Sequence, residues 1–336
     1  MGNSTFRRLG QLLDTIVVLF KRDLRLHDNP ALAAARRDAE RVVPLFVRDP
    51  RFPAPERRLA FLDRLLQTIP GLTVAHGDYV EEVARFEPDA VYLSEDASPY
   101  ARRRERRLAE RFDTRLFPGT TVVPFDEIKT YRVFTPYFRV WQQQPLRAVE
   151  DGGAPETEAQ RRLDEWLASD AELGSRLSPY LHFGAVSPLE CVVRGGHKPE
   201  WVRQLAWRDF YLQLLRAEPH RFALGAPQSA DARLEDWKNS RTGFALVDAG
   251  MRQLREEGWM PNRVRMVCAS VLVHGYGLDW RLGAAHFEEL LLDGDVAANR
   301  GNWLWIAANT RRVFNPDLQA QKLPEYVARW RIPETG

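Results

Sequence analysis

One predicted helix in the second half of the chain carries polar side chains that are unusual on an apolar surface. Residues 200–217 have the spacing of a helix, and one face of it would carry Trp201, Gln204, Arg208 and Tyr211. An arginine and an amide cost free energy when buried, unless a partner satisfies their hydrogen bonds. A neighbouring helix or a bound polar ligand would serve as that partner, and this stretch alone leaves both interpretations open.

A second stretch, residues 258–278, contains no acidic residue but includes two arginines. A helix here would place four residues on one stripe: Asn262, Arg265, Met266 and Ala269. Arg263 lies beside that stripe. The pattern is compatible with a surface that meets an anion, although such a stretch taken singly is more often structural than functional.

A third stretch begins with Asp293-Gly294-Asp295 and continues as a predicted helix to residue 307. One aspartate at a helix start is an ordinary N-cap, but two separated by glycine indicate a carboxylate directed elsewhere. Asn299 and Trp303 follow one turn apart. The three stretches together supply arginines, amides, carboxylates and tryptophans. This set suits a bound flavin beside a nucleic-acid site.

The first 125 residues alternate short β-branched runs with amphipathic stretches. The expected strands are 15–20, 42–47, 72–76, 90–94 and 114–117, and the expected helices are 30–38, 56–68, 80–86 and 99–112. Unbroken apolar strands alternating with helices predict a parallel sheet covered on both faces. The residues after the first strand lack the glycines of a dinucleotide fingerprint, which argues against an NAD site there.

The remaining chain is predicted to be helical. Residues 149–157 are rich in glycine and polar side chains and read as a linker, after which the expected helices are 200–217, 243–257, 262–274, 284–292 and 296–307. The predicted fold class is therefore α/β, with an N-terminal doubly wound parallel-sheet domain followed by an all-helical domain. The expected boundaries are 1–125 for the first domain, 126–173 for a linker and 174–336 for the second domain.

Composition narrows the class of protein further. The only cysteines, Cys191 and Cys268, exclude a disulfide framework, an iron–sulfur cluster and a cysteine-built zinc site, and no metal site is expected. No apolar run reaches membrane-spanning length and no secretion signal is evident, so we expect a cytoplasmic protein. The net charge of +2 does not by itself indicate nucleic-acid binding, so local clusters must carry that argument.

Seven stretches of the chain carry a family resemblance. They are KRDLRLHDNPALAAA (21–35), YRVFTPYFRVW (131–141), GSRLSPYLHFG (174–184), WRDF (207–210), MRQLREEGWMPNRVRMVCAS (251–270), DGDVAANRGNWLW (293–305) and RVFNP (312–316). In this order they resemble the photolyase/cryptochrome family, in particular the bacterial photolyases that repair cyclobutane pyrimidine dimers. The resemblance implies an N-terminal α/β domain, a helical domain that binds FAD, and a monomeric protein that acts on DNA containing pyrimidine dimers.

The resemblance also implies roles for individual residues. The loop Ser175, Arg176, Leu177 and Ser178 would hold the FAD phosphates. The flavin and ribose would be lined by Trp201, Gln204, Arg208, Asn262, Arg265, Asp293, Asp295 and Asn299. Arg265 would pair with Asp293, and Asn299 would face the flavin N5. The lesion would meet Trp207, Asn262, Met266 and Trp305, while Arg263 would contact the DNA backbone. The residues implied to take part in catalysis are Trp303, Trp280, Gln204, Asn299 and Met266.

Relatives pass electrons to the flavin along three tryptophans, and two of these match Trp303 and Trp280. The outermost has no aligned counterpart, because residues 226–235 are shortened and contain no aromatic. Trp237 is the nearest tryptophan in sequence and is our candidate for the outer donor. A second, antenna chromophore is left open, since Ala101 stands where some relatives carry an acidic residue that contacts a folate.

The chain departs from the family pattern in ways that keep other functions under consideration. It is shorter than most relatives, with contractions between Trp141 and Gly174 and after Thr310. Gln204 stands where dimer photolyases usually carry glutamate, and glutamine there is more typical of (6-4) photolyases, although Asn262 and Met266 occupy the positions of the (6-4) histidines. The alternatives are a (6-4) photolyase, a cryptochrome-like photoreceptor and a single-strand-specific repair enzyme.

Overall fold

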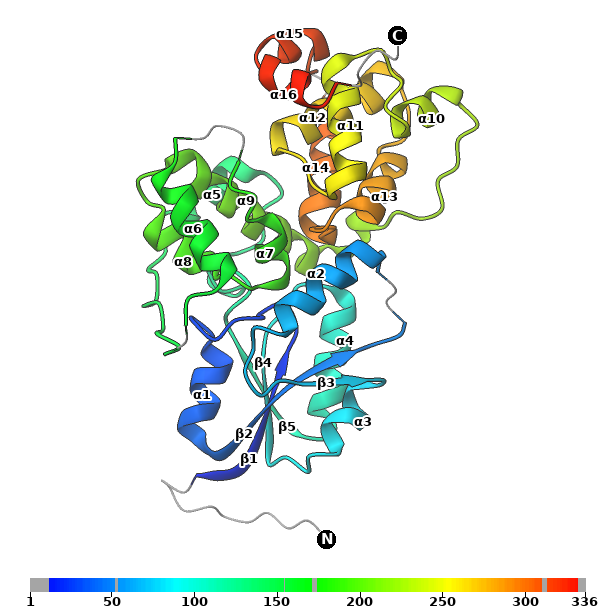
Figure 1. Ribbon diagram of the computed structural model, residues 1–336. Helices are drawn as coiled ribbons and strands as arrows, with labels where there is room; N and C mark the ends of the chain where they lie inside the picture. Colours follow the sequence, from blue (N-terminus) through cyan, green and yellow to red (C-terminus); the bar gives the residue numbers. More distant parts are fainter. Residues whose placement is uncertain (1–11, 52–53, 154, 171–173, 310–312, 332–336) are drawn as a thin grey trace.

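A computed structural model describes residues 12–51, 54–153, 155–170, 174–309 and 313–331 (Figure 1). Its strands are β1 (Leu13–Phe20), β2 (Ala39–Arg48), β3 (Thr73–His76), β4 (Ala90–Ser94) and β5 (Asp113–Phe117). All pairings between them are parallel, in the order β3-β2-β1-β4-β5. The order reverses between β1 and β4, so the predicted doubly wound sheet is confirmed.

Alternation along β1 explains how helices cover both faces of the sheet. The helices of this domain are α1 (Pro30–Asp38), α2 (Glu56–Leu66), α3 (Tyr79–Ala84) and α4 (Pro99–Ala109). Ile16 and Val18 belong to the same core cluster as residues of α1 and α2. Val17 and Leu19 pack instead with residues of α3 and α4. Both faces of a central strand are therefore buried, which is why its sequence is a continuous apolar run.

The helical part consists of two lobes, which lie above the sheet domain in Figure 1. The first lobe contains α5 (Phe134–Trp141), α6 (Glu158–Ala168), α7 (Ser178–Phe183), α8 (Pro188–Arg194) and α9 (Pro199–Ala217). The second contains α10 (Ala232–Lys238), α11 (Ala245–Glu257), α12 (Asn262–Ser270), α13 (Trp280–Leu290), α14 (Val296–Ala308), α15 (Pro316–Gln321) and α16 (Pro324–Arg329). The lobes meet where α14 packs on α9. There Gly301 is required for space, since a Cβ would lie 2.3 Å from the Tyr211 ring.

The structure differs from the sequence prediction at several places in the helical part. The segment 126–173, expected to be a linker, contains α5 and α6, which belong to the first lobe. The predicted helix 262–274 ends at Ser270 and continues as a π-helical turn, Val271–Gly275. Helix α13 begins at Trp280, earlier than expected, because the Asp279 side chain accepts a hydrogen bond from the Arg281 backbone N–H at 2.9 Å and caps it.

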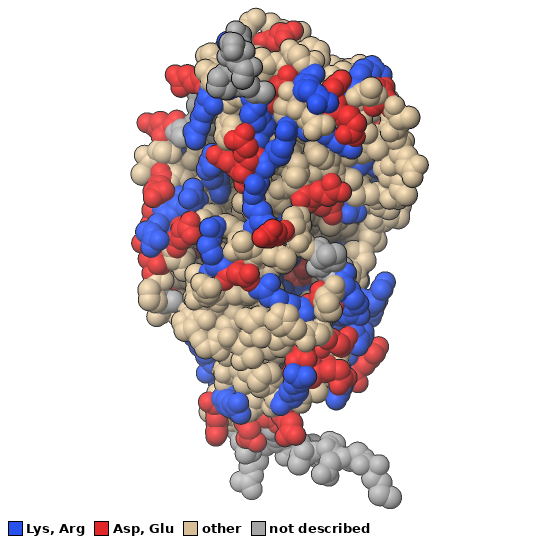
Figure 2. All heavy atoms as spheres, turned by 45° about the vertical axis from the view of Figure 1, so that its right-hand side comes forward, with Lys and Arg blue, Asp and Glu red and all other residues tan. Residues whose placement is uncertain are grey.

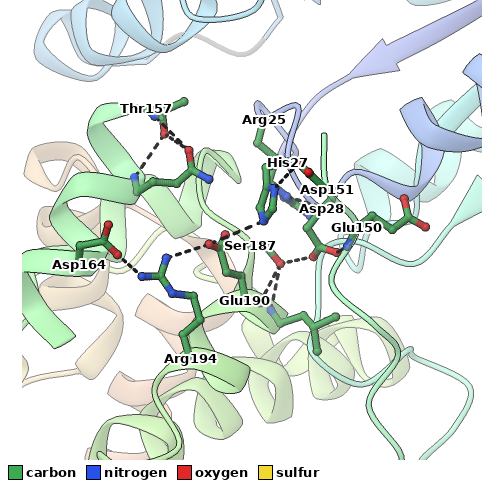
Figure 3. Close-up of polar contacts among 12 residues, drawn as sticks. Arg25, His27, Asp28, Glu150, Asp151, Thr157, Asp164, Ser187, Glu190 and Arg194 are labelled. Atoms are coloured by element: carbon green, nitrogen blue, oxygen red, sulfur yellow. Dashed lines mark hydrogen bonds and ion pairs between the residues drawn. The ribbon is translucent and has the colours of Figure 1, made fainter. Parts of the chain in front are cut away.

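A polar cluster with Asp28 buried at its centre joins the sheet domain to the first lobe (Figure 3). Asp28, in the loop after β1, is fully buried with a φ of 51°. Its carboxylate accepts hydrogen bonds from Arg147 at 2.9 Å and from the Ser187 hydroxyl at the start of α8. His27 lies 3.8 Å from both Asp151 and Glu190. Side chains of the first matching stretch, 21–35, therefore hold the sheet domain against the first lobe.

Within the described ranges, no helix is both long and apolar enough to cross a membrane.

Candidate flavin and nucleic-acid site

The loop before α7 links the two lobes. Arg176 has a φ of 55° and forms an ion pair with Glu257 at 3.0 Å, while its guanidinium lies 4.5 Å from the centre of the Trp259 ring. The indole N–H of Trp259 donates to the Ser178 hydroxyl at 3.2 Å, and the Ser175 hydroxyl accepts a backbone N–H at 3.2 Å. Half-buried hydroxyls and a guanidinium in one loop are suitable donors to a diphosphate.

The two aspartates before α14 have different partners, as the sequence indicated. Arg265 holds Asp293 with two nitrogens, each 3.1 Å from a different carboxylate oxygen. Asp295 caps α14, where its Oδ1 accepts the Ala298 backbone N–H at 2.8 Å. The predicted Arg265–Asp293 pair is thus confirmed as a contact.

Asp295 has two further partners that sequence reasoning missed. Its Oδ2 accepts a hydrogen bond from Arg22 of the sheet domain, and His182 Nδ1 lies 3.5 Å away. Burial acts to raise the pKa of Asp295, but Arg22 and His182 together hold it well below its ordinary value. Burial also lowers the pKa of His182. The only sequence signal for Arg22 was its place in the matching stretch 21–35.

Asn299 lies one turn into α14 and is buried. Its side-chain N–H donates to the Ala284 carbonyl at 2.9 Å, so α13 fixes the orientation of the amide. Carboxylates, an amide and a guanidinium therefore meet at the start of α14. A flavin ring carries N–H groups, carbonyl oxygens and unprotonated nitrogen atoms. The carboxylates and the amide oxygen can accept hydrogen bonds, and the guanidinium and the amide N–H can donate them, so these side chains fit a flavin.

Trp207 on α9 lies at the centre of an aromatic cluster. Its ring stacks on Phe134 with centroids 3.7 Å apart and meets Trp305 edge to face at 6.3 Å. Trp207 and Trp305 were both predicted from the resemblance, and the structure brings them together. Phe134 was not predicted, although it lies in the matching stretch 131–141. Met266 is half-buried, and its sulfur lies 3.8 Å from the Asn262 amide nitrogen.

The other predicted residues lie around this centre in different environments. Trp201 is buried in the first lobe and its ring meets Trp166 at 6.2 Å. Arg208 donates to the backbone carbonyls of Thr120 at 2.6 Å and Leu181 at 3.2 Å. Leu177 is buried, whereas Gln204, Asn262 and Arg263 are exposed. Trp201 and Arg208 therefore have partners within the protein. The sequence pattern of their helix had left open whether such partners come from the protein or from a bound ligand.

The predicted electron-relay tryptophans lie at different depths. Trp303 is buried and meets Trp237 at 6.1 Å. Trp237 is fully buried and its indole N–H donates to the Cys268 carbonyl, which argues against the prediction that it is the outer donor. Trp280 is partly exposed and lines an open hollow of about 540 Å³. Gly283, one turn after Trp280, lies against the Trp303 ring. Of the three tryptophans, Trp280 is therefore the most exposed to solvent.

Asp209, next to Arg208, is fully buried and gives a testable pH dependence. Its Oδ2 accepts hydrogen bonds from the backbone N–H groups of Val122 and Val123 and from the Trp141 indole, at 2.8, 3.2 and 3.1 Å. Burial raises its pKa to about 6 despite these donors and Arg208. Because the folded pKa lies above the ordinary value, the contribution to stability is complete below about pH 4 and is lost as pH rises through about 6.

We expect Asp209→Asn to remove this pH dependence. The amide oxygen can accept the same three hydrogen bonds without a buried charge, so the variant should be more stable than the wild type at pH 8 by about 1–3 kcal/mol and no more stable at pH 4. Urea unfolding of both proteins at the two pH values measures the difference. A stability difference that is the same at both values would contradict the titration of Asp209.

The chain was compared with known proteins. Residues 16–156 match the family model for DNA photolyase, and residues 201–335 match the FAD binding domain of DNA photolyase. The deoxyribodipyrimidine photo-lyase of Streptomyces griseus is 39% identical, with 96% of this chain and 90% of that protein covered. An enzyme of the same name from Thermus thermophilus is 34% identical, with 94% and 91% covered.

Solved structures agree with the sequence relatives. An archaeal photolyase from Sulfolobus tokodaii, solved with two FAD molecules, superposes with a TM-score of 0.84 at 29% identity, covering 94% of this chain and 90% of that one. A class III photolyase from Agrobacterium tumefaciens has a TM-score of 0.84 at 25% identity, covering 97% and 88%. The alignment with the Streptomyces protein spans 412 positions and this chain has 336 residues, so at least 76 positions are gaps here.

Proposed function

Since the chain belongs to the DNA photolyase family, we propose that it repairs cyclobutane pyrimidine dimers in DNA, using light and bound FAD, as a cytoplasmic monomer. One observation carries the proposal. Helix α14 begins at the Asp293–Arg265 pair, presents Asn299 one turn later, and brings Trp305 against Trp207 of α9. A flavin site and an aromatic lesion pocket therefore share one rigid helix.

Each group of residues has a distinct task in this proposal. Bound FAD, once reduced, supplies the electron that splits the dimer under illumination. Ser175, Arg176 and Ser178 hold the diphosphate, while Asp293 and Asn299 orient the ring system. Trp207 and Trp305 present apolar surfaces to a dimer turned out of the duplex, which costs little because a dimer pairs and stacks poorly.

The direct test is repair of a short DNA carrying one defined cyclobutane thymine dimer. The FAD-loaded, chemically reduced protein should restore both thymines under blue light and leave them dimerised in the dark. A matched DNA carrying a (6-4) product should remain unchanged. Repair of the (6-4) product alone would show that the protein is a (6-4) photolyase, the alternative suggested by Gln204. Repair of neither DNA would favour a cryptochrome-like photoreceptor.

Figure 2 shows charges of both signs interspersed on one face of the molecule, and the net charge is only +2, so we expect DNA binding to depend on a few positions and not on an overall positive charge. Arg263 is exposed at the start of α12 and was predicted to contact the backbone. We expect Arg263→Ala to weaken binding to damaged and undamaged DNA alike and to lower the salt slope by about 1. Trp305→Ala should instead weaken binding to dimer-containing DNA alone, by about tenfold, as stacking on a base is worth roughly 1–3 kcal/mol.

The two variants are compared by titrating labelled DNA, with and without a dimer, at several salt concentrations. Arg37→Ala, which removes an exposed arginine of α1 in the sheet domain, is the matched control and should change neither quantity. Equal losses on both DNAs for Trp305→Ala would contradict its place in a lesion pocket.

A further inference from the structure

Two arginines of the sheet domain reach the loop that carries Asp293 and Asp295. Arg58 lies in the first turn of α2, and Arg22 lies in the loop after β1. In Figure 1, α2 approaches the base of the second lobe, and the hydrogen bonds of Arg58 show that the contact is direct. The loop is thus held by a domain other than its own.

Arg58 fixes the backbone on the N-terminal side of the loop. Its Nε and Nη2 donate to the Leu291 carbonyl at 3.0 and 2.7 Å, and Nη2 also donates to the Glu288 carbonyl. These carbonyls end α13 and have no partner within the helix, so a cation there satisfies them and interacts favourably with the helix dipole.

Gly294 shows how closely Arg58 fits the loop. A Cβ at this position would lie 2.2 Å from Arg58 Nη2 and 2.9 Å from its Cζ. Gly294 is not among the described residues with positive φ, so the glycine is required for space and not for backbone conformation. The loop that places one aspartate on each side of Gly294 is therefore shaped against Arg58.

Arg22 fixes the second carboxylate. It donates to Asp295 Oδ2, and its Nε donates to the His182 carbonyl at 3.0 Å, which sets the direction of the guanidinium. The other oxygen of Asp295 caps α14. Both oxygens of this buried carboxylate are therefore committed, one to the start of the helix that carries Asn299 and one to the sheet domain.

We propose that Arg22 and Arg58 are positioning residues of the flavin site, through which the sheet domain holds Asp293 and Asp295 in the geometry that binds FAD. The inference rests on the proposed function, because it takes FAD as the ligand of this loop. It predicts that the sheet domain contributes to the affinity and the reduction potential of the flavin without touching it.

The test compares FAD affinity and midpoint potential in Arg22→Gln, Arg22→Lys and Arg58→Ala. Arg22→Gln leaves Asp295 buried without its cation, so FAD should dissociate about tenfold more readily, the usual effect of losing a charged hydrogen bond. Its midpoint potential should become more negative, because a nearby positive charge favours the reduced, negatively charged flavin. Arg22→Lys keeps the charge and should restore the potential. Arg58→Ala should weaken FAD binding by a similar factor.

Arg57→Ala is the matched control. Arg57 precedes Arg58 on α2 and also crosses to the second lobe, where it donates to the Arg255 carbonyl of α11 at 2.9 Å. It should leave affinity and potential unchanged. If Arg57→Ala weakens FAD binding as much as Arg58→Ala, or if Arg22→Gln retains wild-type affinity and potential, the inference is overturned while repair by the wild type still stands. A wild type that binds no FAD would instead overturn the proposed function.

Discussion

Asp293→Ala should yield a protein that purifies without FAD. The substitution leaves the Arg265 guanidinium without its partner at a largely buried position, where the arginine side chain is 20% exposed and the aspartate 7%. Breaking a buried ion pair from one side costs about 3–5 kcal/mol. Because Asp293 is also proposed to orient the flavin ring, we expect FAD to bind at least about 100-fold more weakly. Flavin absorbance per protein and titration with FAD measure the loss.

Two further variants show whether FAD is lost because the Asp293–Arg265 ion pair is broken or because any aspartate of this lobe has been removed. Asp231→Ala removes an aspartate of the same lobe that caps α10 and pairs with Arg233 at the surface, and it should leave FAD binding intact. Asp293→Ala combined with Arg265→Ala should cost less than the sum of the two single changes, since the buried charge is then gone from both sides. Full flavin content in Asp293→Ala would show that the ligand is held elsewhere.

The sheet domain could be predicted from sequence because its signals are local. The strands β1 and β2 are rich in β-branched residues, and the burial of β1 and β4 on both faces accounts for the absence of alternation. The start of α14 was predictable for a similar reason, since an aspartate before a helix caps it, and a second aspartate in the same loop has no such task. The prediction that it turns toward another partner was confirmed by Arg265.

What the sequence did not indicate depends on contacts between distant segments or on short elements. Arg22 and Asp295 are 273 positions apart, and nothing local to Arg22 marks its partner. Phe134 stacks on Trp207 across two helices, which a pattern within either helix cannot show. Helices α7 and α8 have six and seven residues, too few for a periodic pattern to be recognised.

Trp237 illustrates a third limit of sequence reasoning. Its position near the shortened segment 226–235 suggested an outer electron donor, but sequence distance does not report depth. The side chain fills the core of the second lobe between Phe287 and Trp303. Trp280 is partly exposed instead, and this difference in depth leads to different predictions for the three tryptophans.

We expect Trp303→Phe to abolish light-driven reduction of oxidised, bound FAD while leaving repair by chemically reduced protein almost intact. Trp303 lies one turn from Asn299 on α14, which puts it close to the predicted position of the flavin ring. Phenylalanine keeps an aromatic core residue but is much harder to oxidise. The smaller ring should lower stability by only about 1–2 kcal/mol. Flavin absorbance under blue light with an external reductant measures the first property, and repair of dimer DNA after chemical reduction measures the second.

Trp280→Phe and Trp237→Phe test whether electrons reach Trp303 from the partly exposed Trp280 or through the buried Trp237. Trp280 borders the open hollow and has solvent access, so its replacement should also slow photoreduction strongly. Trp237 meets Trp303 but is fully buried, so a reductant in solution cannot donate an electron to it directly, and Trp237→Phe should photoreduce at nearly the wild-type rate. If Trp237→Phe loses photoreduction and Trp280→Phe keeps it, electrons enter through the core of the second lobe. If Trp303→Phe photoreduces at the wild-type rate, neither tryptophan route carries them.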